Sequence, residues 1–109
     1  VRWQKPVAVL TNRRSFSSTN DFVSKMRQMP KAVIIGDKTG GGSGLPFSSE
    51  LPNGWSVRFS ASPMFDPDMN HTEFGIEPDI KVNMESQDIQ KGIDTIIETA
   101  RQYLLEHKE

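Results

Sequence analysis

The chain has 109 residues, enough for one domain with a buried core. Its 13 basic and 14 acidic side chains give a net charge of −1, so charge indicates neither nucleic-acid nor anionic-membrane binding. The absence of cysteine excludes disulfides, thiolate zinc sites and a cysteine nucleophile. No apolar run approaches the roughly twenty residues of a membrane span, and no charged-then-apolar leader opens the chain. Because it begins at Val1 rather than methionine, we expect a piece of a larger protein.

The first third of the sequence predicts a strand, a helix and a second strand. The apolar run of residues 7–10, within "KPVAVL", is typical of a short buried strand. Apolar residues at helical spacing predict a helix over residues 19–29, closed by Pro30. The segment "KAVIIGD" predicts another buried strand. Residues 6–36 therefore form a strand-helix-strand unit, which implies parallel strands and an α/β fold.

A glycine-rich loop, "TGGGSG", separates this unit from a predicted β-hairpin. Within "FSSELPNGWSVRFSAS", Asn53 and Gly54 are typical of a two-residue turn. Apolar residues alternate with polar ones from Trp55 to Ala61. This period of two predicts that one face of the hairpin is buried.

The last third predicts a loop, a strand and a long helix. Residues 63–75 show neither strand nor helix periodicity and predict a loop. Residues 80–82 alternate as a short last strand, with Pro78 marking its edge. From Ser86 onward one apolar stripe predicts a single terminal helix over residues 86–107, slightly weakened by Gly92.

Ser17 lies where a strand turns into a helix, and two roles are open for it. Free N–H groups at the positive end of a helix stabilise an alkoxide or oxyanion, which favours a nucleophile. Serine before a helix is equally typical of an N-cap, and Ser18 with Asp21 resembles a capping box. Position alone leaves both roles open.

Four motifs in order resemble a known family. The segments "VLTNRRSFSSTNDF", "AVIIGDKTGGGSG", "LPNGWSVRFSAS" and "FGIEPDI" resemble the second half of the catalytic domain of C-terminal processing peptidases, or tail-specific proteases. The residues of these segments are most similar to those of the tricorn-core-like branch and of related peptidases of gut Bacteroidetes. The resemblance covers Lys5 to Val82 and implies an α/β fold related to ClpP and crotonase. Residues 1–109 would then be the C-terminal portion of one serine peptidase domain.

The resemblance assigns roles at the elbow before the helix. The family pattern of asparagine, serine, nucleophilic serine and small residues is matched by Asn12, Ser15, Ser17 and Thr19. Ser17 takes the nucleophile position, and the Ser18 amide would be one oxyanion-hole donor. The second donor in the family is a glycine upstream of Val1. Asn20 stands where the family usually has a glutamate, which we interpret as a branch variation.

A serine nucleophile needs a base to remove its proton, and the resemblance implies that this base lies outside the elbow before the helix. Tail-specific members use a lysine at the position that Gly42 occupies here. Lys38 is near, but its side chain would have to turn back past three glycines. The tricorn-like branch instead uses a histidine from the earlier half of the domain, a second serine and a glutamate. Glu73, just before "GIEPD", is the nearest acidic candidate, and a solvated loop carboxylate is an equal alternative.

Neither histidine of this chain is a clear base. His107 lies in the charged tail, and His71 lies in a loop two residues before Glu73, where a surface position is the simpler interpretation. His71, Asp66, Asp68 and Glu73 are metal-ligand types without a recognised ligand spacing, so we expect no metal and no cofactor.

The glycine loop matches neither of two nucleotide-binding motifs. Position 42 is not the lysine of a phosphate-binding loop, and no helix follows as a dinucleotide fingerprint requires. Gly40, Gly41 and Gly42 instead allow an extended peptide to approach the backbone, although a flexible turn is the simpler alternative.

We therefore expect a serine-type peptidase fragment that hydrolyses peptide bonds through an acyl-enzyme on Ser17 and is inactive alone. The first alternative is a non-catalytic peptide- or ligand-binding relative of the same fold; the second is an unrelated interaction domain in which Ser17 belongs only to a cap. Expected partners are a peptide or protein substrate, the missing N-terminal half of the domain, and further copies of the fragment through exposed apolar surface. The resemblance implies a bacterial extracytoplasmic protein, in the periplasm.

Overall fold

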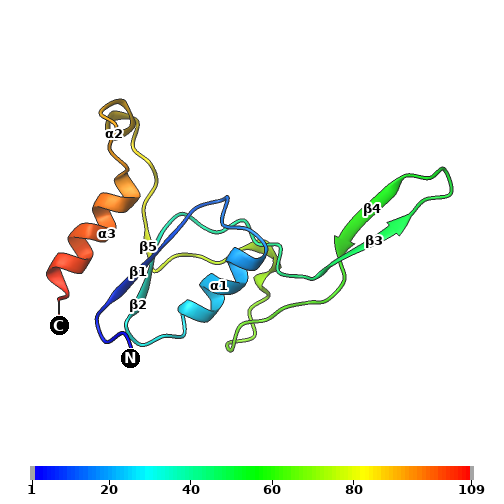
Figure 1. The fold of residues 1–109 in the computed structure, drawn as a ribbon, viewed down its shortest axis with the longest axis horizontal. Helices are drawn as coiled ribbons and strands as arrows, with labels where there is room; N and C mark the ends of the chain where they lie inside the picture. Colours follow the sequence, from blue (N-terminus) through cyan, green and yellow to red (C-terminus); the bar gives the residue numbers. More distant parts are fainter. Residues whose placement is uncertain (1, 109) are drawn as a thin grey trace.

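The computed structural model describes residues 2–108 and is built on a three-stranded parallel sheet (Figure 1). The strands are β1 (Val7–Thr11), β2 (Ala32–Gly36) and β5 (Ile80–Lys81), in the order β1-β2-β5. Both pairs are parallel, with Thr11 opposite Gly36 and Gly36 opposite Lys81. Helix α1 (Ser18–Met26) connects β1 to β2, which confirms the predicted strand-helix-strand unit. The helix ends three residues before the predicted Met29, because the chain already turns at Arg27.

Strand β2 is buried on both faces, which explains its continuous apolar run. Val33 and Ile35 pack on one face against helix α3 (Thr95–Glu106), where they meet Ile96 and Ala100. On the opposite face Ile34 packs against Val23 of α1 and against Ile76. The sheet therefore lies between two helices, and the α/β class predicted from the sequence is correct.

The predicted single helix over residues 86–107 is wrong. The structure has α2 (Ser86–Gln90) and then α3, separated by a turn. Gly92 in this turn has φ 71°, a left-handed conformation that ends a helix. Asp94 then caps α3 by accepting the Ile97 N–H at 2.9 Å. The apolar stripe runs through both helices, so periodicity did not reveal the break.

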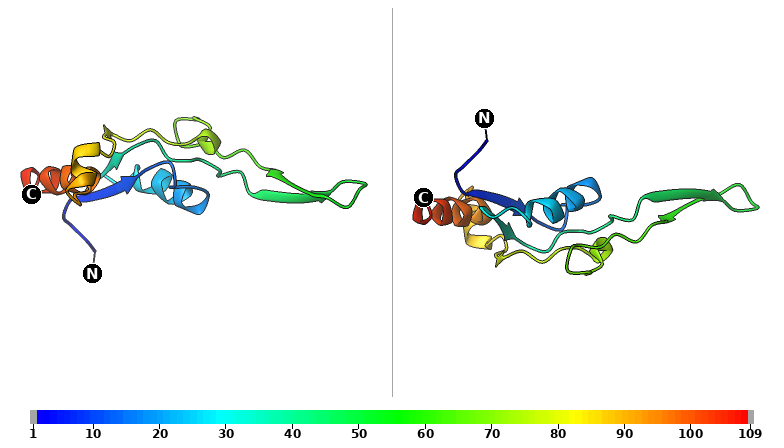
Figure 2. Two further views of the ribbon diagram at one scale, coloured as in Figure 1. Left: turned by 90° about the horizontal axis from the view of Figure 1, so that it is seen from above. Right: turned by 90° about the horizontal axis from the view of Figure 1, so that it is seen from below.

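The chain between β2 and β5 includes an antiparallel hairpin that projects away from the sheet and its helices (Figures 1 and 2). Its strands are β3 (Pro46–Glu50) and β4 (Ser56–Ser60), with Phe47 opposite Phe59. Every residue of both strands is exposed, and Phe59 retains 50% of its accessible surface. The predicted buried face is therefore wrong for this chain: the alternating pattern is present, but nothing in residues 2–108 covers it.

The hairpin turn also differs from the prediction. The Leu51 N–H donates to the Trp55 carbonyl at 2.7 Å, and the Gly54 N–H donates to the Leu51 carbonyl at 2.8 Å. Three residues, and not two, therefore lie inside the turn. Of the three turn residues, only Gly54 has positive φ, at 83°, whereas a two-residue turn of the predicted kind needs it at Asn53 as well. Pro52, the residue before Asn53, favours an ordinary turn with negative φ at the position that it occupies.

The predicted loop over residues 63–75 contains one short 3-10 helix, η1 (Thr72–Phe74). The segment between η1 and β5 lies beside the residues that follow β2, where the Thr39 N–H donates to the Ile76 carbonyl at 3.0 Å. Ligands usually bind at this carboxyl edge of parallel α/β sheets. Within residues 2–108, no helix has both the length and the apolar character needed to cross a membrane.

Candidate active site

Ser17 lies at a strained elbow between β1 and α1. Its backbone has φ 58° and ψ −124°, a conformation that residues other than glycine rarely adopt. Local bonds hold the approach to this elbow: the Asn12 side chain accepts the Arg14 N–H at 2.8 Å, and the Ser15 hydroxyl accepts the Asn12 N–H at 3.1 Å. Such strain is typical of functional positions, where the surrounding structure enforces it.

The Ser17 hydroxyl does not cap the helix. It forms no side-chain cap hydrogen bond, and only the Ser17 carbonyl serves the helix, by accepting the Asp21 N–H at 3.1 Å. Ser18 is the first residue of α1, so its N–H has no partner inside the helix. No acceptor from another described segment takes that N–H. The elbow therefore presents a half-buried hydroxyl beside an unpaired amide hydrogen.

One peptide group of the glycine loop connects this elbow to Glu73. The Gly41 carbonyl accepts the Ser17 N–H at 2.8 Å, and the adjoining Gly42 N–H donates to the Glu73 carbonyl at 2.9 Å. Both glycines have positive φ, 78° and 79°. A Cβ at Gly41 would lie 2.0 Å from the Glu73 carbonyl oxygen, and one at Gly42 would lie 2.4 Å from the Phe16 ring. Glycine is thus required at both positions for the segments to approach this closely.

A cavity of about 300 Å³ brings several predicted site residues together. Ser17, Gly42 and Glu73 all line it. Gly41 contacts the same segments through its backbone, whereas Gly40 lies against the Arg13 carbonyl, where a Cβ would approach to 2.4 Å. The complete lining is Phe16, Ser17, Gly42, Pro46, Arg58, Phe59, Ser60 and Glu73.

The carboxylate of Glu73 is held by Ser60, which the sequence did not single out. The Ser60 hydroxyl donates to Glu73 Oε1 at 2.6 Å. Oε2 is buried and has no hydrogen-bond partner among the described residues. In sequence Ser60 is one of several alternating polar residues of β4, and only the tertiary contact distinguishes it.

Asn20, one turn into α1, is fully buried and connects three segments. Its side-chain amide donates to the Ser43 hydroxyl at 2.6 Å and to the Thr72 carbonyl at 2.9 Å. Its side-chain oxygen accepts the Thr39 hydroxyl, whose oxygen in turn accepts the Ile76 N–H at 2.7 Å. The residue at the position of the family's usual glutamate therefore joins α1, the glycine loop and the Glu73 segment.

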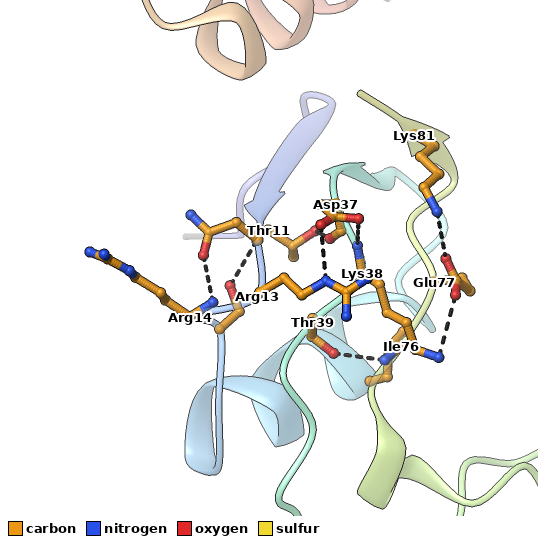
Figure 3. Close-up of polar contacts among 11 residues, drawn as sticks. Thr11, Arg13, Arg14, Asp37, Lys38, Thr39, Ile76, Glu77 and Lys81 are labelled. Atoms are coloured by element: carbon orange, nitrogen blue, oxygen red, sulfur yellow. Dashed lines mark hydrogen bonds and ion pairs between the residues drawn. The ribbon is translucent and has the colours of Figure 1, made fainter. Parts of the chain in front are cut away.

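The base candidates of this chain are engaged elsewhere. Lys38 Nζ lies 3.4 Å from Glu77 Oε1, and Figure 3 shows the Lys38 side chain directed at that carboxylate. The His71 ring packs between Phe65 and Phe74, with ring centroids 5.1 and 5.5 Å away. Neither Lys38 nor His71 lines the Ser17 cavity. Within residues 2–108, no group of three or more His, Cys, Asp or Glu side chains is placed to hold a metal ion.

An ion pair fastens the start of the elbow to the end of β2 (Figure 3). Asp37 accepts the Lys38 N–H at 2.8 Å and the Arg13 Nε–H at 3.2 Å. The Lys38 amide first, and the Arg13 guanidinium second, hold the pKa of the Asp37 carboxyl below its usual value. The Thr11 hydroxyl donates to the Asp37 carbonyl at 2.8 Å and adds a second link between the strand ends.

Comparisons with known proteins agree with this architecture. A candidate peptidase from Parabacteroides merdae, known from a crystal structure, is 64% identical with a TM-score of 0.92 over 95% of this chain. This chain spans only 33% of that protein's length. Mature CPAF is 25% identical with a TM-score of 0.70 over 78% of this chain and 17% of its own. The tricorn protease, at 21% identity and a TM-score of 0.78 over 93% of this chain and 10% of its own, shares the fold.

Among sequence relatives, a Chlamydia trachomatis protein is 26% identical over 106 residues, which cover 93% of this chain and 18% of that protein. The model of peptidase family S41 matches residues 1–82. That match includes the elbow, the glycine loop, the hairpin and the Glu73 segment. The chain therefore belongs to peptidase family S41.

Proposed function

We propose that this chain supplies the nucleophile of a serine peptidase of the tail-specific and tricorn-like type. The observation that carries the proposal is the position of Ser17: a strained elbow places this residue, whose hydroxyl forms no cap bond, on the wall of the same cavity as Glu73. Ser17 Oγ attacks the carbonyl carbon of a peptide bond, and its proton passes to a base. The C–N bond then breaks, the base returns the proton to the leaving amine, and water hydrolyses the acyl-Ser17 ester.

The surrounding backbone fits the other requirements of this reaction. The unpaired Ser18 N–H would donate to the carbonyl oxygen as negative charge develops on it. Gly42 lines the cavity without a side chain, which leaves room for an extended peptide substrate, whereas Gly40 and Gly41 lie against the chain's own Arg13 and Glu73 carbonyls. The fixed Glu73 carboxylate would orient the base.

The base itself, we propose, is a histidine from polypeptide outside residues 1–109. The pairing of Lys38 with Glu77 and the packing of His71 between two aromatic rings support this part of the proposal. Residues 1–109 alone would then be inactive, because loss of the base typically costs several orders of magnitude in rate. We also propose a bacterial, periplasmic location, which the resemblance to C-terminal processing peptidases supports. Fractionation of cells carrying a tagged protein would test it.

Labelling with a fluorophosphonate tests the nucleophile directly. In the complete protein that carries these residues, we expect one labelled site at Ser17 and complete loss of labelling and peptide hydrolysis in Ser17→Ala. Ser18→Ala is the matched control, since it removes the neighbouring hydroxyl and keeps the amide. Equal labelling of the wild-type protein and Ser17→Ala would refute the peptidase proposal and favour a non-catalytic peptide-binding relative.

A further inference from the structure

Glu73 and Ser60 form a pair that only the folded chain creates. Ser60 is the last residue of β4, and Glu73 lies 13 positions later in η1. The Ser60 hydroxyl donates to Oε1 at 2.6 Å. Oε2 remains buried without a partner among residues 2–108. Oε1 is thus fixed by a hydrogen bond, while Oε2 is enclosed by the chain itself.

The glycine at position 44 makes room for this pair. A Cβ at Gly44 would lie 2.4 Å from the Ser60 Cβ and 2.7 Å from Glu73 Oε2. The Gly44 carbonyl also accepts the N–H groups of Ala61 and Ser62, each at 2.9 Å, which holds the end of β4 against the loop. A side chain at position 44 would compete with Oε2 for its space.

We propose that Ser60 is a positioning residue of the peptidase site. Its hydroxyl holds the Glu73 carboxylate through Oε1 at the wall of the Ser17 cavity, where the carboxylate orients the base, and Gly44 leaves the space in which Oε2 lies. This inference rests on the proposed function, because the carboxylate needs a fixed orientation only if it orients a base. Ser60 acts through Glu73 and does not itself touch the reacting atoms.

Loss of the Ser60 hydroxyl should act on the chemical step and not on substrate binding, because Ser60 holds a carboxylate that orients the base.

The experiment compares Ser60→Ala with Ser56→Ala in the complete protein, on a chromogenic peptide that the wild-type enzyme cleaves. Both serines lie on β4, and Ser56 forms no side-chain hydrogen bond with any described residue. For Ser60→Ala we expect kcat to fall about tenfold, the scale of one hydrogen bond to a charged group, with KM unchanged within about twofold. Ser56→Ala should match the wild-type enzyme in both quantities.

A pair of isosteric variants separates the hydroxyl from folding. Ser60→Thr keeps the donor and should retain kcat within about twofold, whereas Ser60→Val removes it and should behave as Ser60→Ala. Equal kcat values for the Thr and Val variants would overturn the inference while Ser17→Ala is still inactive. Full activity in Ser17→Ala would instead defeat the proposed function itself, so the two failures are distinguishable.

Discussion

Asn20 illustrates how one buried polar side chain can determine the geometry of a whole site. Its amide and oxygen satisfy groups on the glycine loop and on η1, and its surroundings admit no solvent. A buried group left unpaired costs more free energy than a hydrogen bond normally contributes, because it has already lost its contacts with water. The placement of Ser17 relative to Glu73 therefore depends on a residue that touches neither hydroxyl nor carboxylate.

We expect Asn20→Ala to lower the free energy of unfolding by about 1–3 kcal/mol, because the Thr39 and Ser43 hydroxyls and the Thr72 carbonyl lose their partner. Urea denaturation followed by circular dichroism measures this change. Asn53→Ala in the exposed hairpin turn is the control and should cost much less. A similar small loss in both variants would contradict the role assigned to Asn20.

Asp37 gives the protein a pH-dependent contribution to stability. Since the pKa of Asp37 in the folded protein lies below its unfolded value of about 3.9, its carboxylate stabilises the fold above that value. The contribution is lost as the pH falls through the folded-state pKa. Asp37→Asn should therefore lower Tm at pH 7 and have no effect near pH 2, in thermal melts at several pH values. Asp68→Asn, on an exposed loop, is the control; a constant difference at all pH values would exclude an ionisation effect.

At the scale of elements, the two C-terminal helices start differently. Asp94 accepts the Ile97 N–H at the start of α3, whereas Glu85 at the start of α2 forms no side-chain cap bond. Helix α3 also supplies the apolar cover of one sheet face through Ile96 and Ala100, so its stability affects the core. Capping by an aspartate is typically worth about 1 kcal/mol.

Asp94→Ala is accordingly expected to destabilise the protein by about 1 kcal/mol, and Glu85→Ala by clearly less. Both variants remove one carboxylate immediately before a helix, so the comparison isolates the hydrogen bond from the loss of charge. Chemical denaturation of the two proteins, in parallel with the wild type, gives the difference. Equal losses would mean that the Asp94 bond contributes nothing beyond its charge.

At the scale of the whole molecule, residues 2–108 leave much apolar surface uncovered. The hairpin extends away from the sheet, as Figure 2 shows in both views, and carries Phe47 and Phe59 as an exposed pair with ring centroids 5.5 Å apart. Strand β1 is also at the edge of its sheet, with one side unpaired among the described strands. Both features are typical of surfaces that bind other polypeptide.

We therefore expect residues 1–109, expressed alone, to self-associate at micromolar concentration. The double variant Phe47→Ser, Phe59→Ser should move the sedimentation profile toward monomer, because it removes the apolar pair from the hairpin. Ser49→Ala on the same hairpin is the control and should leave the profile unchanged. A wild-type profile that is monomeric throughout this range would contradict the prediction.

Local pattern alone determined the centre of the fold. The runs at residues 7–10 and 32–35 specified two parallel strands, because a sheet covered on both faces needs apolar side chains in both directions. The predicted burial is correct for β2, whereas β1 at the edge of the sheet is only partly buried and Leu10 is 43% exposed. Periodicity gave a wrong prediction wherever the packing of a segment differed from its sequence pattern. The hairpin alternates as if one face were buried yet projects from the described chain, and the stripe beyond Ser86 continues across a turn made by Gly92 and Asp94.

The order of the motifs was sufficient to indicate the family. It also selected the candidate site residues Ser17, Ser18, Gly42 and Glu73. Their spatial relation needed the tertiary structure, since a hydrogen bond between distant segments leaves no local sequence signal. Three such contacts connect residues at least 13 positions apart. They are the peptide group that joins Ser17 to Glu73, the bond from Ser60 to the Glu73 carboxylate, and the network around Asn20. Sequence specified which groups the chain carries; folding decided which of them meet.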